Sequence, residues 1–182
     1  MASDTEHIVL GSGKAYIQEF TGALPTDNTT IETDANLLGY IQGGAQLEYK
    51  PKFYDAQDDL GVVKKTILTD EEVTFKTGVL TWNGKTLQRV CSTAVVIETT
   101  TLRTVKIGGL GRQDGKRYLI RFVHEDTTDG DIRVTIVGYN QSGFTLKFAK
   151  DKETVIDAEF TAQPMDSDGT LIIYEEEIKA AS

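Results

Sequence analysis

The glycine-rich run GGLGRQDGK at residues 108–116 is the stretch that most resembles a phosphate-binding motif. A phosphate-binding loop that ends in Gly-Lys needs Gly at position 110 and Ser or Thr at position 117, because its backbone N–H groups must wrap the phosphates. The chain has Leu110 and Arg117 there. The dinucleotide fingerprint fails too, since the glycines are one residue too widely spaced and no helix pattern follows. The run is predicted to be a hairpin turn.

Two acidic stretches resemble metal-ligand clusters, but neither has the required pattern. In the His-Glu-Asp cluster at 124–126, neighbouring residues of a strand point to opposite faces, and the only other histidine is His7 near the start. The stretch DSDGT at 166–170 resembles the opening of a calcium loop, yet the sixth place has Leu171 where glycine is required. We interpret the first cluster as solvated turn residues and predict no metal site.

Nucleophilic chemistry would have to use Cys91, the only cysteine, with His124 brought close by the fold. That arrangement stays open at this point, although the helical spacing of Leu87, Val90 and Cys91 favours a buried thiol on the apolar face of a short helix capped by Asn83. The carboxylates are too numerous to indicate an acid and base pair. We therefore predict no catalytic residue, no cofactor and no enzymatic activity.

Composition describes a single acidic domain. The 182 residues have 19 Lys and Arg against 28 Asp and Glu, a formal net charge of −9 and a pI near 4.7. Such a chain repels nucleic acid, whose binding requires cationic contacts, although it can surround DNA without gripping it. The start has neither the basic segment nor the apolar run of a signal peptide, and no apolar run is long enough for a membrane anchor. We expect a soluble protein made inside the cell.

Alternation of apolar and polar residues predicts a mainly β fold, a β-sandwich or barrel with one short flanking α-helix. Residues 21–39 have little periodicity and are predicted to form a long loop or arm. Residues 44–81 are predicted to form a long hairpin with a polar tip. Further strands are expected at VVIET, RTVKIGG, RYLIRFVHE, DIRVTIVGY, FTLKFA, TVIDAEFTA and TLIIYEEE.

The closing series of strands and turns, ending in KDKETVIDAEFTA and TLIIYEEE, resembles that of the major tail tube proteins of tailed bacteriophages. The resemblance extends back through LGSGKAYIQEF, ALPTD, GGAQLEYKPKFYDAQDDLG and TGVLTWNGKTLQRVCSTA, and so covers nearly all of the single domain at 1–182. It implies a virion protein, made in the host bacterial cytoplasm, that forms stacked hexameric rings. Long hairpins of all subunits would join into an inter-subunit β-barrel through which DNA passes. Tape measure, tail terminator and tail tip proteins are the other implied partners.

The resemblance also suggests roles for individual residues. Residues expected to line the channel are Glu48, Lys50, Glu72, Lys76, Arg121 and Arg133. Residues expected to contact other subunits are Tyr49, Phe53, Tyr54 and Leu60, together with the arm at 21–39. A polar sheet face that merely meets solvent has the same pattern, so the sequence leaves both interpretations open.

Two alternatives remain at the level of sequence. The inner tube of a contractile, phage-tail-like injection particle or bacteriocin has the same architecture. A carbohydrate-binding or adhesive β-sandwich belongs to a different class, and it would place aromatic residues such as Trp82 and Tyr139 on an exposed platform.

Overall fold

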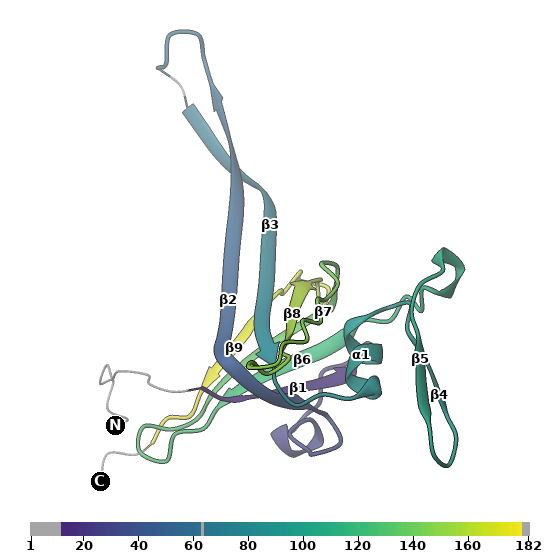
Figure 1. The fold of residues 1–182 in the computed structure, drawn as a ribbon. Helices are drawn as coiled ribbons and strands as arrows, with labels where there is room; N and C mark the ends of the chain where they lie inside the picture. Colours follow the sequence, from purple (N-terminus) through teal and green to yellow (C-terminus); the bar gives the residue numbers. More distant parts are fainter. Residues whose placement is uncertain (1–11, 63, 180–182) are drawn as a thin grey trace.

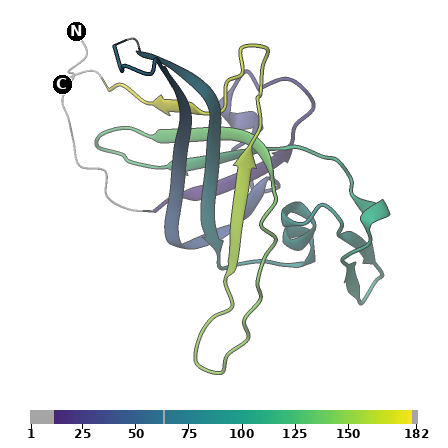
Figure 2. The ribbon, with the colours of Figure 1, turned by 90° about the horizontal axis from the view of Figure 1, so that it is seen from above.

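A computed structural model describes residues 12–62 and 64–179, so His7 lies outside the described residues. The chain is mainly β, as predicted, with one short α-helix (Figures 1 and 2). In chain order the elements are β1 Lys14–Glu19, the 3-10 turn η1 Asn28–Thr30, β2 Leu37–Gln57, β3 Lys64–Val79, α1 Gly84–Val90, β4 Val95–Glu98, β5 Arg103–Lys106, the 3-10 turn η2 Leu110–Arg112, β6 Tyr118–His124, β7 Ile132–Asn140, β8 Ile156–Ala162 and β9 Ile173–Glu176. None of the described helices is long and apolar enough to cross a membrane.

Six of the described strands close into an antiparallel ring in the order β6, β1, β2, β3, β8 and β7, with β7 pairing back to β6. The far edge of β7 is shared, because its first half pairs with β9 and its last three residues pair with β8. β4 and β5 form a separate hairpin beside α1, outside the ring (Figure 1). Ring closure leaves few free edges in the body of the molecule.

Alternate residues of the ring strands point inward and form the main core. Its fully buried members include Ile17, Ile120, Ile136, Ile156 and Phe160. α1 closes the core on one side with Leu87 and Val90, as the helical spacing predicted. The predicted cap is also confirmed, because the Asn83 side chain accepts a hydrogen bond from the Lys85 N–H in a full capping box.

Residues 21–36, called the strap below, cover the outer face of β1, β6 and β7. Ile31 is completely buried in a second apolar cluster with Tyr16, Leu119 and Val137. The Ile17 N–H also donates to the Asn36 carbonyl at 2.8 Å. The prediction of a long loop is right for most of this segment, but the strap packs on its own chain instead of extending away as an arm.

Several sequence expectations were wrong in detail. FTLKFA forms no strand, because the Asn140 side chain accepts from the Ser142 and Gly143 N–H groups and turns the chain out of the β7–β8 ladder. The 108–116 run links β5 in one sheet to β6 in the other, so it is a connection between sheets and not a hairpin turn. α1 ends at Val90 and leaves Cys91 half-buried at its C-cap.

Candidate assembly surface

β2 and β3 continue far beyond the ring as a two-stranded hairpin, the longest projection in Figure 1. β1 pairs with β2 only at Leu37–Tyr40, and β8 pairs with β3 only at Thr74–Val79. The β2–β3 ladder nevertheless runs on from Lys50 opposite Glu72 to Gln57 opposite Lys64. Both outer edges of this hairpin are therefore unpaired within the described chain. The predicted long hairpin is confirmed, with β2 beginning earlier than expected.

One face of the hairpin is apolar. Strand alternation and the register place on it Leu47, Tyr49, Pro51, Phe53 and Leu68, with Glu71 opposite Pro51. Nearer the tip the same face becomes polar, with Asp55, Thr66 and Lys64. Towards the ring this face joins the core through Val73 and Phe75, which are buried. Further out its side chains meet solvent, and Phe53 is 61% exposed. This apolar face is a continuation of the core: residues 168–172 border it beside Tyr49 and Val73, whereas Phe53 and Leu68 further out are exposed.

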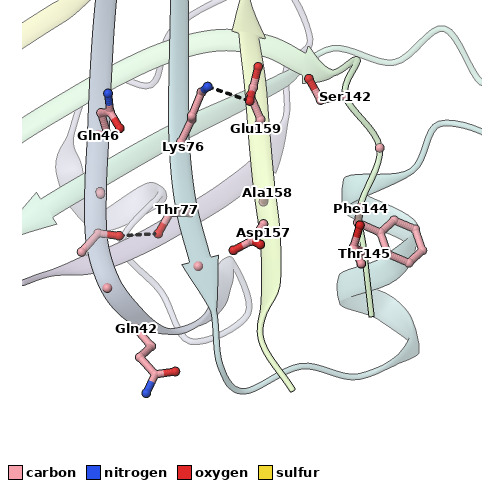
Figure 3. Close-up of a pocket in the computed structure, with 15 residues that line it drawn as sticks. Gln42, Gln46, Lys76, Thr77, Ser142, Phe144, Thr145, Asp157, Ala158 and Glu159 are labelled. Carbon is pink, nitrogen blue, oxygen red and sulfur yellow. Dashed lines mark hydrogen bonds and ion pairs between the residues drawn. The ribbon is translucent and has the colours of Figure 1, made fainter. Parts of the chain in front are cut away.

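The opposite face carries charges of both signs. It holds Gln46, Glu48, Lys50, Lys52, Lys65, Asp70, Glu72 and Lys76. Ion pairs join Glu48 to Lys50 at 3.0 Å and Lys52 to Asp70 at 2.8 Å. Near the ring Lys76 reaches Glu159 of β8 at 2.9 Å, which raises the pKa of Lys76 and lowers that of Glu159 (Figure 3). Lys50 and Lys52 of β2 lie opposite Glu72 and Asp70 of β3, so the field of this face is largely neutralised.

The hairpin bends where it leaves the ring. Gly43 and Gly44 form a two-residue bulge in β2 between the pairs Gln42–Gly78 and Ala45–Thr77, with φ values of 81° and 79°. Such angles favour glycine, since other side chains are strained there. Beside the bulge lies an open pocket of about 490 Å³, bounded by β2, β3, β8 and residues 142–145 (Figure 3). Its described lining includes no Cys or His, so it holds no nucleophile with an adjacent imidazole base.

The four residues expected to contact other subunits all lie on the hairpin and are exposed. Phe53 lies on the apolar face and Tyr54 on the charged face opposite Ile67. Tyr49 donates its hydroxyl hydrogen to Glu71 at 2.7 Å, which raises its pKa. Leu60, in the turn at the tip, is 85% exposed. Contact with another subunit stays a prediction; Phe53, Tyr54 and Leu60 are largely exposed, and Tyr49 is about half exposed beside residues 168–172.

The six residues expected to line a channel divide into two groups. Glu48, Lys50, Glu72 and Lys76 lie together on the charged face. The structure does not bring Arg121 and Arg133 to that face, and for Arg121 the expectation of an open side chain is wrong, because it is buried beneath the strap.

Both arginines hold the strap to the ring. Arg133 donates from Nε to Glu32 Oε1 at 2.8 Å, and Arg121 Nη1 lies 3.4 Å from the same oxygen. Arg121 also donates to the Thr135 hydroxyl at 3.0 Å and to the Asn28 side chain. Glu32 accordingly raises the pKa of Arg133. Because both arginines are largely buried and engaged with several partners, their role is to hold the strap against the strands.

The candidates for chemistry have other partners in the structure. His124 is buried, contrary to the expectation of a solvated turn, and its Nδ1 contacts the Ser12 carbonyl, whereas Cys91 contacts the Thr93 hydroxyl. Asp126 accepts from two backbone N–H groups of its turn, which lowers its pKa. The pKa of Asp166 is also lowered, because its carboxylate accepts from the Thr170 side chain and from the Thr170 and Asp168 N–H groups of the turn at 166–170. Among the described residues no group of three His, Cys, Asp or Glu side chains is placed to hold a metal ion.

The aromatic platform of the carbohydrate interpretation does not form around Trp82. Its indole N–H donates to the Thr154 carbonyl at 3.0 Å and its ring packs against the main core. Tyr139 is half-buried within the β7–β8 ladder. Both residues are thus only partly exposed, and Trp82 is held against the core.

Sequence reasoning missed the bulge that directs the hairpin. Its signal was available, because two consecutive glycines inside an alternating strand pattern indicate a bulge or a sharp bend. It also missed Leu68, which lies opposite Phe53, because the extra residue Thr69 shifts the register of β3. A register shift of one residue cannot be detected from alternation in one strand alone.

In comparisons with known proteins, no protein family model matches the chain, and no curated protein matches it.

Proposed function

We propose that this chain is the structural subunit of a viral tail tube, which assembles into stacked hexameric rings around a channel that carries DNA into the host. The observation that supports this best is the hairpin beyond the ring, with two unpaired edges and two chemically different faces. The sixfold symmetry, the location in the virion, and the tape measure, terminator and tip partners come from the sequence resemblance.

Unpaired strand edges are templates for another chain. Residues 50–57 and 64–72 of the hairpin offer ladder N–H and carbonyl groups on both sides, and Pro51 is the single proline in them. An antiparallel partner on each side satisfies these groups without any change of fold. Because one edge belongs to β2 and the other to β3, copies join head to tail, and head-to-tail contacts close into rings.

The two faces suggest how such a sheet is oriented. Exposed apolar side chains such as Phe53 and Leu68 gain by burial, at roughly 25 cal/mol per Å² of apolar surface. We place this face against protein and the charged face towards the channel. The hairpin contributes three acidic and four basic side chains to that face, and Asp157 and Glu159 of β8 continue it. DNA therefore meets a wall of mixed sign with little net charge and can move without breaking ion pairs at each step.

Negative-stain electron microscopy of the purified protein tests the proposal, with hollow tubes or stacked rings as the expected result. The matched variant replaces residues 50–72 by Asn-Gly, which joins the register partners Tyr49 and Val73 through a two-residue turn and leaves the ring intact. It is expected to remain a folded monomer. Tubes from the shortened variant, or only monomers from the intact chain under all assembly conditions, contradict the proposal.

The charged face can be tested in an assembled particle. Glu48→Lys with Glu72→Lys changes the balanced lining to a cationic one, and DNA ejection is expected to slow markedly or stop while tubes still form. Unchanged ejection kinetics would show that this face does not line the channel.

A further inference from the structure

The charge of this protein is unevenly distributed. Residues 84–117, called the cationic arm below, contain seven Lys and Arg but only two acidic residues, a net charge of +5. The whole chain has a net charge of −9, so the remaining residues together have −14. The cationic arm consists of α1, the β4–β5 hairpin and the η2 turn, which project from one side of the ring (Figures 1 and 2).

Some of the cationic side chains of the arm are used within the chain. Arg89 donates to the Leu37 and Ala35 carbonyls, Lys116 pairs with Glu19 at 2.6 Å, and Arg117 stacks on Phe20. Lys85 and Arg103 share the single carboxylate of Glu98. Lys106 and Arg112 are exposed and form no ion pair with any described residue. The outer part of the arm therefore has uncompensated positive charge.

The same part of the arm exposes apolar side chains. They are Val95, Ile97, Leu102, Ile107 and Leu110. Leu110, at the start of the η2 turn, is 99% exposed. Apolar groups gathered on a small projection indicate a surface that is covered by a partner. A matching partner surface must combine apolar groups with negative charge.

Such a surface exists on the opposite side of the same molecule. The turn between β6 and β7, residues 125–131, and the end of β9, residues 174–178, lie together at the side away from the arm in both views (Figures 1 and 2). We call these two segments the acidic end. Glu175, Glu176 and Glu177 are consecutive and exposed, beside the exposed Tyr174 and Ile178. Within the described part of the chain neither Glu176 nor Glu177 forms an ion pair.

We propose that the cationic arm of one copy docks on the acidic end of the next copy, along the edge of β9 that no described strand pairs with. Glu176 and Glu177 lie on opposite faces of this edge, so Lys106 and Arg112 grip it from its two faces, one carboxylate each. This contact rests on the proposed function in that it presumes self-assembly, but it uses surfaces separate from the β2–β3 hairpin. Because the two surfaces lie on opposite sides of one molecule, the contact is head to tail and repeats with every added copy.

A second copy fits the arm better than nucleic acid does. A nucleic acid drawn to Lys106 and Arg112 also meets the field of a body with a charge of −14, which opposes binding. The exposed Leu102 and Leu110 gain nothing from a phosphate backbone, whereas Tyr174 and Ile178 offer apolar contact area. Complementary charge also sets the register and accelerates encounter between like molecules.

A charge exchange tests the contact. The first variant has Lys106→Glu with Arg112→Glu, and the second has Glu176→Lys with Glu177→Lys. Each alone places like charges against each other, so its self-association measured by sedimentation velocity is expected to weaken at least about tenfold. An equimolar mixture restores both contacts by strict alternation and is expected to associate as wild type does. Raising the salt from about 0.1 M to about 1 M shortens the Debye length from about 10 Å to about 3 Å and should reduce these differences.

The matched control is Lys150→Glu with Lys152→Glu. It changes the net charge by the same amount as the first variant, on two exposed residues outside both surfaces. Its self-association is expected to equal that of wild type, and circular dichroism of all variants checks that each is folded.

The outcomes separate this contact from the tube proposal. If the wild type forms tubes and both variants form them equally well, the contact is wrong and the tube proposal stands. If the wild type forms no tubes but the mixture of variants associates while each alone does not, the contact stands and the tube proposal falls. If nothing associates under any condition, both are wrong. If the first variant is weakened and the mixture does not recover, the arm docks on some other anionic surface, and the proposed pairing is overturned.

Discussion

β2 and β3 pass through two environments, and the difference between them shows what a strand pattern does and does not specify. Within the ring, Val73, Phe75 and Val79 are buried in the main core. Beyond the ring, Phe53 and Leu68 occupy the same face of the same ladder and remain exposed. Apolar and polar residues alternate in the same way in both parts of these two strands. Burial depends on whether another element packs on the apolar face, which the single chain supplies only at the base.

The largest expected effect lies in the ring. Phe160 is completely buried at the centre of the core, so Phe160→Ala is expected to lower the free energy of unfolding by about 3 to 5 kcal/mol through lost contacts and an unfilled cavity. Urea denaturation followed by the fluorescence of Trp82 measures this. The control is Phe148→Ala at an exposed position, where a change of less than about 0.5 kcal/mol is expected. Equal effects would mean that the ring is not the stabilising unit.

The next effect compares two carboxylates with different surroundings. Glu32→Gln removes the carboxylate that Arg133 and Arg121 share beneath the strap and leaves them Asp131 and Glu175 as acidic partners. It is expected to cost about 2 kcal/mol, because charge-assisted hydrogen bonds of two largely buried arginines are lost. Glu48→Gln on the hairpin breaks an exposed pair with Lys50 and is expected to cost at most about 1 kcal/mol. Thermal unfolding compares them. A smaller loss for Glu32→Gln than for Glu48→Gln would contradict the structural role of the strap.

The substitution Phe53→Ser is expected to impair self-association while it leaves the stability of the isolated chain nearly unchanged. The side chain contributes little to the isolated chain, so the free energy of unfolding should change by less than about 0.5 kcal/mol. Self-association should nevertheless be lost if the apolar face of the hairpin is buried between copies. Size-exclusion chromatography with light scattering measures this against Phe148→Ser, an equally drastic change off the hairpin. Association that survives Phe53→Ser would argue that this face stays in solvent.

The smallest effect is the response to acid. Lys52 and Lys76 lower the pKa values of Asp70 and Glu159, so these pairs contribute stability above the unfolded-state pKa, and that contribution is lost as pH falls through the folded-state pKa. Carbon-13 NMR titration is expected to give midpoints below the usual value of about 4. Lys52→Met and Lys76→Met should each restore the midpoint of the partner carboxylate, and Lys152→Met should change neither. Unshifted midpoints in the wild type would show that these pairs do not persist in solution.

Much of the fold was predictable because local chemistry is sufficient for it. Alternation marked most of the strands, Asn83 marked the start of the helix, and the polar stretch between two alternating runs marked the long hairpin. The expected strand at FTLKFA fails although Phe144 and Leu146 do pack against the core, because a strand also needs a partner ladder and the Asn140 turn removes it. Side-chain pattern alone carries no information on whether the backbone finds a partner.

The candidate site was predictable only in part. Glu48, Lys50, Glu72 and Lys76 lie on one face because strand geometry requires it once the hairpin is recognised. Arg121 and Arg133 have the same alternating pattern, yet they pair with Glu32, which is about 90 to 100 residues away in sequence. No local pattern indicates that the strap covers them.

The sequence by itself determined that the chain is acidic, mainly β and equipped with one long amphipathic hairpin, since composition and period-two alternation are properties of neighbouring residues. Only the tertiary structure decided that six strands close into a ring, that the strap covers one outer face, and that the hairpin emerges with both edges open. The physical reason is that ring closure and burial depend on contacts between residues distant in sequence, and each such contact is selected by packing and hydrogen bonding across the whole molecule.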